Sequence, residues 1–370
     1  MDTDKQRNLS ASNIDEVLFS ERESVGEMVL NRPQALNALT QNMVLLMQDQ
    51  LEKWSNDSRI SMILIRGAPR GEKMVPFCSG GDLRSIYEHR NDPNKTFASI
   101  FYAQEYRLNS YINKYPKPYM SIIDGIVMGG GVGVSIHGSH RIMSERSVFA
   151  MPETGIGLFP DVGGTYFLSR LPGSIGLYIG LTSARLTASD CLNLGIATHF
   201  ISSNRIDEFT NAINSCDLQQ DTTSKLEEII SYHESVPESA PILQYTDQID
   251  RCFSARCVEE IFSNLEKEKS EWAIETIKIL QTKSPTSLKL TFRQLTTLGH
   301  LNLRDALNME YRMAVRCNFS KDWFEGIRAV IIDKDFAPEW YPAEIAEVDH
   351  ELIDEYFKAP RCGDMRFDSS

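Results

Sequence analysis

The sequence predicts an α/β fold that is followed by a helical region. Up to about residue 205, short apolar segments that end at glycine alternate with helical patterns, which is typical of strands joined by crossover helices. Beyond that point, amphipathic helices rich in charge are expected at 257–281, 304–317 and 321–332. Polar residues cluster between the two parts, which predicts a first domain over residues 14–205 and a helical region over residues 220–350.

The first elements follow from apolar segments and from a helix-start signal. Residues 17–19 and 26–30 are expected to form two strands joined by a turn, and Asn31-Arg32-Pro33 ends the second. Thr40 is a good N-cap, and the helix that it starts carries apolar side chains at helical spacing: Met43, Leu46, Met47, Leu51 and Trp54. Further strands are expected at 61–67, 119–125, 140–144 and 147–150.

Two glycine clusters follow apolar segments. Residues 77–83, Phe-Cys-Ser-Gly-Gly-Asp-Leu, lead into a helix expected near Asp82, where small residues would let a ligand approach backbone N–H groups. A Gly-Gly pair by itself favours the simpler interpretation of a tight turn. Residues 124–134 run through Gly129-Gly130-Gly131 into an apolar helix, whose N-terminus would attract negative charge. Close packing of a helix on a strand explains those glycines equally well.

The segment 152–164 holds two carboxylates in a stretch too rich in glycine and proline to be an ordinary helix. If Glu153 faces the same cavity as the Gly130 N–H, it can act as a base or a nucleophile on a carbonyl that backbone donors polarise. Asp161 lies in the same segment and could instead cap a helix that starts near Gly164. Two acids beside two glycine turns favour chemistry over capping.

Composition argues against several other classes of function. The formal net charge of -13, with no basic tract, is unlike that of a nucleic-acid binder, and no apolar run is long enough to span a bilayer. The seven cysteines form no C-x-x-C pair and no zinc-type spacing, so no metal site is expected. An odd, scattered set of cysteines indicates a reducing compartment. His137 and His140 follow the triple glycine, where a structural role is expected.

Taken together, these motifs resemble those of the crotonase (enoyl-CoA hydratase/isomerase) superfamily. The resemblance extends from about residue 15 to residue 345, and its segments are 30–39, 77–83, 125–133 and 152–153. The thioester hydrolases of that superfamily are further marked by the segments 159–164, 283–289 and 324–334. Each motif is weak alone, but jointly they are specific.

The resemblance implies a ClpP-like spiral of ββα units with a helical C-terminal region. It implies an oxyanion hole formed by the backbone N–H groups of Ser79 and Gly130. Glu153 and Asp161 would be the catalytic acids, and Glu105 a further acid of the substrate pocket. CoA would be held by loop 34–38 and residues 79–83, which contain the remaining expected contacts: Ala35, Asn37, Gly81, Asp82 and Leu83.

One departure from the hydratases favours hydrolysis over hydration. Hydratases of this superfamily carry a second glutamate where this chain has Gly133, and placing water across a double bond needs both acids. The resemblance therefore implies hydrolysis of 3-hydroxyisobutyryl-CoA, as in valine breakdown, with Glu153 either activating water or attacking the carbonyl. Asp161 would orient the 3-hydroxyl group and protonate the departing thiolate. CoA would be part of the substrate, and no separate cofactor is expected.

Alternatives remain open at this point. Another acyl-CoA hydratase, isomerase or hydrolase of the same fold is one, and a non-enzymatic subunit associated with mitochondrial ribosomes is another. A homo-oligomer is possible, whereas nucleic-acid and membrane partners are not expected. The polar segment Met1–Lys5 resembles neither a secretory signal nor a transit peptide, so a bacterial-type cytoplasmic enzyme is expected. A mitochondrial matrix protein without its presequence would look similar.

Overall fold

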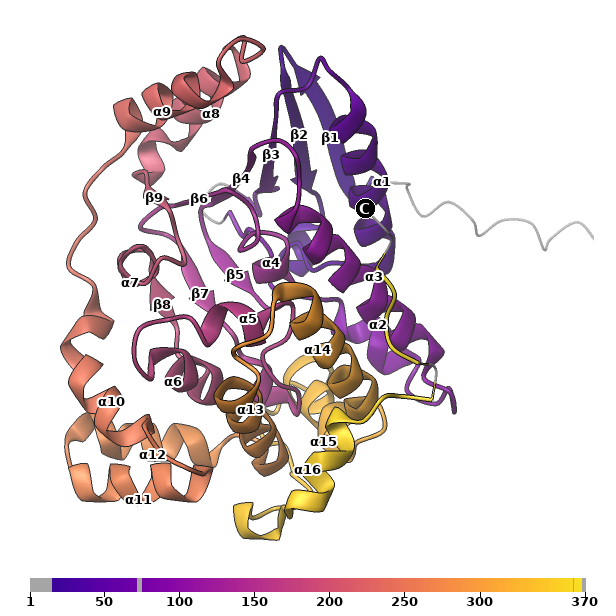
Figure 1. Cartoon of the computed structure of the whole chain (residues 1–370), viewed down its shortest axis with the longest axis vertical. Coiled ribbons are helices and arrows are strands. Elements are labelled where there is room, and N and C mark those ends of the chain that lie inside the picture. Colours follow the sequence, from indigo (N-terminus) through magenta and orange to yellow (C-terminus); the bar gives the residue numbers. More distant parts are fainter. Residues whose placement is uncertain (1–14, 72–74, 362, 368–370) are drawn as a thin grey trace, which may run out of the picture.

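The strands form two sheets that follow one spiral path (Figure 1). The computed structural model describes residues 15–71, 75–361 and 363–367, so the segment Met1–Lys5 and the expected domain start at residue 14 lie outside it. The larger sheet has six strands in the order β1-β2-β3-β4-β6-β9. They span Val17–Arg22, Val25–Leu30, Met62–Gly67, Tyr119–Ile123, His140–Met143 and His199–Phe200. The expected strands of the first part are confirmed.

The second sheet repeats the path of the first. Its strands β5 (Ile126–Met128), β7 (Val148–Ala150) and β8 (Leu186–Thr187) lie side by side. β1 and β2 are antiparallel, and the later pairs of the larger sheet are parallel. β4 leads into β5 and β6 leads into β7, while Cys78, downstream of β3, forms an isolated bridge to Val127. Each turn of the chain thus adds one strand or bridge to each sheet, which is the expected spiral.

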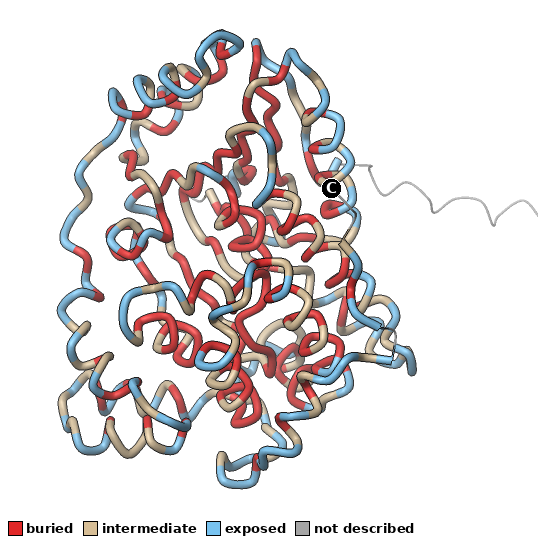
Figure 2. The backbone as a smooth tube through the Cα atoms, in the orientation of Figure 1, coloured by how far each residue is buried: buried red, intermediate tan, exposed pale blue. Residues whose placement is uncertain are grey.

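Helices cover both faces of the larger sheet. On one face lie α1 (Gln41–Asn56) and α3 (Thr96–Asn113), and the Thr40 hydroxyl accepts the Met43 N–H as the expected N-cap. On the other face, α8 (Ile206–Asn214) and α9 (Thr222–His233) share an apolar cluster with β2, β3, β4 and β6. Figure 2 shows that burial follows the strands and is weaker along the outer helices. The polar linker therefore contains helices that complete the core.

Short helices sit between the strands. They are α2 (Leu83–Glu88), α4 (Gly130–Gly133), α5 (Gly164–Leu168), α6 (Ile175–Thr182) and α7 (Ala188–Asn193). The Asp82 side chain caps α2 by accepting the Ser85 N–H, so the helix begins where the sequence predicted. None of the described helices combines the length and the apolar character that crossing a bilayer requires.

The C-terminal region is helical, as expected. Its helices are α10 (Thr246–Phe253), α11 (Val258–Glu268), α12 (Glu271–Gln281), α13 (Pro285–Thr297), α14 (Leu303–Cys317), α15 (Lys321–Ile327) and α16 (His350–Phe357). The segment expected as one helix over 257–281 is two, because Lys269 takes a left-handed conformation and Ser270 caps the next helix. α15 continues into a π-helical turn, Arg328–Ile332. Figure 1 shows α13 to α16 grouped together, with α13 and α14 beside α5.

Candidate active site

Glu153 begins a short 3-10 helix, η2 (Glu153–Ile156), directly after β7. Its side chain is only 3% exposed. η2 is fixed from two sides, since the Thr154 hydroxyl donates to the Leu181 carbonyl and the Ser284 N–H donates to the Thr154 carbonyl at 3.1 Å. The Glu153 carboxylate is therefore held by a fixed turn, although this turn lies between loop segments.

The triple glycine faces Glu153. Gly129 has a φ of +47° and precedes α4, and a Cβ atom built on it would lie 3.2 Å from Glu153 Oε1. A Cβ atom on Gly130 would lie 2.4 Å from Glu105 Oε1 and 3.2 Å from the Gly81 nitrogen. Only glycine leaves room here for a carboxylate and a backbone turn to approach each other. Close approach at a polar site therefore fits Gly129 and Gly130, whereas Gly131 packs against Cys78, as the packing interpretation expects.

One of the two expected oxyanion donors is already engaged. The Ser79 N–H donates to the Leu36 carbonyl at 3.1 Å. For the N–H groups of Gly130 and Gly81, no acceptor is found within the described part of the chain. The oxyanion hole expected at Ser79 and Gly130 stays a prediction: the Gly130 N–H has no acceptor in the described part of the chain, whereas the Ser79 N–H is bonded to the Leu36 carbonyl.

Three expected acids form one buried cluster. Glu105 comes from α3 and is 2% exposed, and Asp161 is 5% exposed. The Tyr106 hydroxyl donates to Asp161 Oδ2 at 2.7 Å. Glu105 Oε1 and Glu153 Oε2 have no hydrogen-bond partner among the residues that the structure describes. Buried, unpartnered carboxylate oxygens are costly, and they accumulate where a ligand is to be bound or a proton moved.

Burial and mutual repulsion raise the pKa values of these acids. The pKa of Glu153 lies well above its usual value because of burial and the nearby Asp161, and the same causes raise the pKa of Glu105. Burial raises the pKa of Asp161 to about 6, although the Tyr106 hydrogen bond opposes the rise. The Lys283 ammonium partly offsets the rise at Glu153. These acids therefore bind protons more tightly than exposed carboxyls do, and the pKa of Asp161 lies close to the pH range in which acid–base catalysis operates.

Asp161 does not cap α5. The N-terminus of α5 donates instead to Glu310 on α14, from the Gly163 N–H at 2.7 Å and the Thr165 N–H at 2.8 Å. The capping interpretation is wrong because a distant carboxylate occupies those donors. Sequence reasoning missed Glu310, since an acid within a charged amphipathic helix carries no local signal.

Some of the residues expected to contact CoA are exposed on their loop, and others are buried and hold the loop in shape. Ala35 is exposed, whereas Asn37 is fully buried and donates to the carbonyls of Ala68 and Pro76. Asp82 accepts from Arg32 as well as capping α2, whose first residue is Leu83. The bonds of the Asn37 side chain to backbone groups shape the loop, and the expected contact of Asn37 with CoA stays a prediction.

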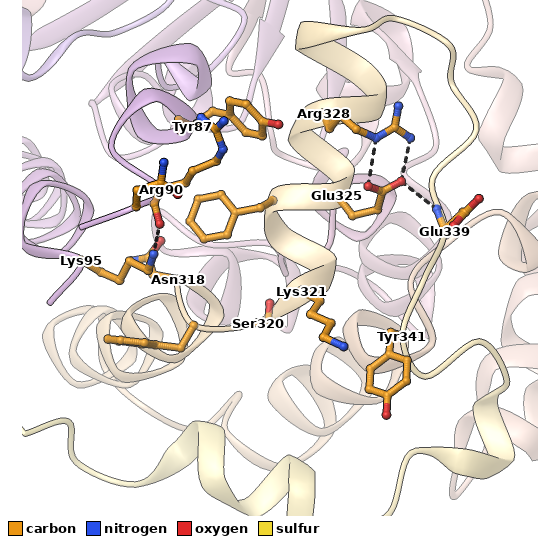
Figure 3. Close-up of a pocket in the computed structure, with 13 residues that line it drawn as sticks. Tyr87, Arg90, Lys95, Asn318, Ser320, Lys321, Glu325, Arg328, Glu339 and Tyr341 are labelled. Atoms are coloured by element: carbon orange, nitrogen blue, oxygen red, sulfur yellow. Dashed lines mark hydrogen bonds and ion pairs between the residues drawn. The ribbon is translucent and has the colours of Figure 1, made fainter. Parts of the chain in front are cut away.

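The cavities found near the C-terminal helices do not contain the acid cluster. One of about 580 Å³ lies between the end of α2 and the face of α15 (Figure 3). Its walls include the cations Arg90, Lys95 and Lys321. A second, of about 280 Å³, lies beside Gly157 and is also lined by Asp322. Within the described residues, no group of His, Cys, Asp or Glu side chains is arranged to hold a metal ion.

Comparison with known proteins identifies the family. The family model described as enoyl-CoA hydratase/isomerase matches residues 25–357. The chain belongs to this family. Among curated members, the protein named 3-hydroxyisobutyryl-CoA hydrolase, mitochondrial, of Danio rerio is 45% identical over 349 residues, which are 93% of this chain and 90% of that protein. Its namesake in Homo sapiens is 43% identical over 357 residues, 95% of this chain and 91% of that protein.

Solved structures of family members show the same architecture. A structure titled as a carnitinyl-CoA dehydratase from Mycobacterium thermoresistibile is 37% identical, with a TM-score of 0.89 over 96% of this chain and 100% of that one. Another, titled as an enoyl-CoA hydratase from Rhodobacter sphaeroides, is 35% identical, with a TM-score of 0.85 over 95% of this chain and 100% of that one. The expected family and its fold are confirmed.

Proposed function

We propose that this enzyme hydrolyses 3-hydroxyisobutyryl-CoA to 3-hydroxyisobutyrate and CoA, a step of valine catabolism. The observation that carries the proposal is the 45% identity to a hydrolase of that name over 93% of the chain. The buried acids supply a chemical reason, because thioester hydrolysis needs a base or nucleophile next to backbone donors. CoA enters as part of the substrate.

In this proposal the thioester carbonyl binds at the N-terminus of α4. The N–H groups of Gly130 and Gly81 have no acceptor in the described part of the chain, so both are free to donate to it. Each such donor is worth about 3 kcal/mol of transition-state stabilisation. Glu153, whose Oε1 lies against Gly129, acts on the carbonyl carbon or on a water molecule. Asp161 and Glu105 orient the substrate hydroxyl, and Asp161 protonates the thiolate.

Gly133 supports hydrolysis over hydration. A Cβ atom at this position would lie 2.8 Å from Val162 Cβ and 2.9 Å from Asn109 Nδ2, so a second catalytic glutamate has no room there. The titles of the two solved relatives, a dehydratase and a hydratase, favour the second candidate function, addition of water to an enoyl-CoA. That reaction needs an acid pair that the site around Gly133 cannot hold.

A panel of acyl-CoA substrates with thiol detection separates the two functions. The enzyme is expected to release CoA from 3-hydroxyisobutyryl-CoA and to leave the double bond of crotonyl-CoA unchanged. Loss of the crotonyl-CoA enoyl absorbance without thiol release would contradict hydrolysis. Absence of both reactions, together with co-sedimentation with ribosomes, would favour a non-enzymatic subunit.

The two roles of Glu153 differ in where oxygen from water goes. In a single turnover in water labelled with oxygen-18, direct attack by Glu153 forms an anhydride, and its hydrolysis leaves label in the protein carboxylate. Activation of water by Glu153 leaves the label only in the product acid. Label found by mass spectrometry in the peptide that contains Glu153 therefore requires the anhydride route, through attack of water on the Glu153 carbonyl.

The cellular compartment that we propose for this enzyme is inferred from its relatives. The curated hydrolases that the chain resembles are named as mitochondrial enzymes. We therefore favour the mitochondrial matrix over the bacterial-type cytoplasm, and subcellular fractionation of the native source tests the choice. Recovery of the enzyme with cytosolic markers would contradict it.

A further inference from the structure

The loop that carries Asp161 is strained. Val162 has a φ of +52° and Gly163 a φ of +92°. Glycine tolerates this left-handed region, but a β-branched side chain does not, so Val162 adopts it only because its surroundings impose it. The conformation of the loop is therefore an outcome of tertiary contacts and cannot come from its local sequence.

Side chains from distant elements hold the backbone of this loop. Gln294 on α13 donates to the Pro160 carbonyl at 2.7 Å, and His137 donates through Nε2 to the Val162 carbonyl at 2.8 Å. Within the loop, the Gly164 N–H donates to the Asp161 carbonyl at 2.7 Å. The polar groups before and after Asp161 are thus fixed, and each contact opposes relaxation of Val162.

Glu310 makes two of these contacts. It is fully buried on α14, and its two carboxylate oxygens accept the N–H groups of Gly163 and Thr165 separately. Burial raises the pKa of Glu310 to about 8, although the hydrogen bonds from Thr165 and Gly163 oppose the rise. α14 also packs against α3, which carries Glu105 and Tyr106. One helix therefore supports the loop of Asp161 and the two side chains that face it.

We propose that Glu310 is a positioning residue for the reaction: by binding the Gly163 and Thr165 N–H groups, it holds Asp161 against Tyr106 in the geometry that catalysis uses. This inference rests on the proposed function. Glu310 lies behind the loop and is not assigned a contact with the substrate. Since its role acts on geometry at the reacting groups, it bears on turnover more than on CoA binding.

Glu310→Gln keeps the size of the side chain but replaces one acceptor oxygen with an NH2 group that faces an N–H donor. We expect kcat to fall about a hundredfold, as small misplacements of catalytic groups do, with KM within about threefold of the wild type. Hydrogen exchange of peptides covering residues 160–168 is expected to rise. If Glu310→Gln does not fold, Glu310→Asp replaces it, since the shorter acid cannot reach both donors.

Asp190→Asn is the matched control. Asp190 is also buried and accepts the N–H groups of Thr187 and Ile242, but it belongs to α7 and is not part of the acid cluster. This variant should lose stability and keep its kcat. Unchanged kcat in the Glu310 variants, or equal losses in the control, would overturn the inference.

Failure of the proposed function gives a different result. If the wild type releases no thiol from any acyl-CoA, the proposed function fails. Hydrogen exchange at residues 160–168 then still decides whether Glu310 holds the loop, because exchange unaffected by Glu310→Gln would contradict that role as well.

Discussion

Glu153 is held in a setting that disfavours its charge. It is buried, one of its oxygens has no partner among the described residues, and the nearby acids Asp161 and Glu310 raise its pKa further. The Lys283 ammonium opposes this rise, and burial lowers the pKa of Lys283 itself to about 8. Such a carboxyl is primed for chemistry at the expense of stability, a common trade-off at active sites.

Glu153→Gln should therefore stabilise the fold, and more so at high pH. The pKa of Glu153 is raised in the folded chain, so the folded state keeps a proton that the unfolded state loses above its ordinary pKa of 4.5. The stability that this group contributes is present below that value and is lost as pH rises through the folded pKa. Glutamine has no such proton. Thermal unfolding should show a larger gain at pH 8 than at pH 5, and an equal gain at both would contradict the protonation argument.

Tyr106→Phe tests the environment of Asp161. The Tyr106 hydroxyl stabilises the ionised form of Asp161, so its loss should raise the pKa of that acid further above about 6. We expect the limb of the kcat/KM profile that reports Asp161 to move upward by about one pH unit. The profile measured from pH 5 to 9 provides the check, with Tyr111→Phe, on the same helix, as the control. An unmoved limb would show that Asp161 does not titrate in the reaction.

The sequence predicted the residues of the site better than the residues that hold them in place. Glu153 and Gly130 stood out because an acid or a glycine run in a loop has few other reasons to be there. Glu310 and Tyr106 lie in helices, where the same residue types are ordinary. The state of the Ser79 N–H depends on how loop 34–38 folds back onto it, and no local pattern records such a contact.

Among the elements, η2 and α15 touch through their backbones. A Cβ atom on Gly326 would lie 2.3 Å from the Ile156 carbonyl carbon, and one on Gly157 would lie 2.3 Å from the Asp322 carbonyl oxygen. These two glycines allow α15 to pack directly against the turn that carries Glu153. The segment 324–334, which marked the hydrolases in the sequence, therefore has a structural explanation at Gly326.

Gly326→Ala should separate these elements. The added methyl group has no flexible neighbour to displace, so we expect a loss of about 3 kcal/mol in the free energy of unfolding together with reduced kcat. Gly155→Ala, within η2, is the control, because its Cβ atom would meet only the Lys283 side chain, at 3.5 Å or more. Chemical denaturation of both variants measures the difference. Equal stability of the two would contradict the tight contact.

Long apolar elements were predictable, and their interruptions less so. Runs of apolar residues predicted the strands at 62–67 and 119–123, and apolar side chains at helical spacing predicted the helix after Thr40. The break at Lys269 was not predicted because a lysine in the left-handed conformation has no distinctive local sequence. Its position follows from how α11 and α12 pack against each other.

At the scale of the whole molecule, the helical C-terminal region completes the site. Gln294, Glu310 and Ser284 each bond to the backbone of residues 154–165 from beyond the expected domain boundary. The sequence predicted the region as a separate unit because charge and periodicity change near residue 205. Long-range contacts between the two parts are invisible to such a pattern.

We propose from these contacts that the parts 14–205 and 220–350 unfold together. Trp54 and Trp323 are both fully buried, one in each part. Variants that keep Trp54 or Trp323 as the single tryptophan, with Trp272 and Trp340 also replaced by Phe, should each show a fluorescence midpoint in urea that coincides with their circular dichroism midpoint. Separate midpoints would mean that the spiral core folds without its C-terminal helices.

The most direct test of the account is CoA release from 3-hydroxyisobutyryl-CoA by the wild type and by Glu153→Gln, with CoA affinity measured by calorimetry for both. The account predicts rapid release by the wild type, a loss of about a thousandfold in the variant, and similar affinities, since the carboxyl acts on the thioester and not on CoA itself. Near-normal turnover by Glu153→Gln would contradict the assignment of the reaction to this buried acid.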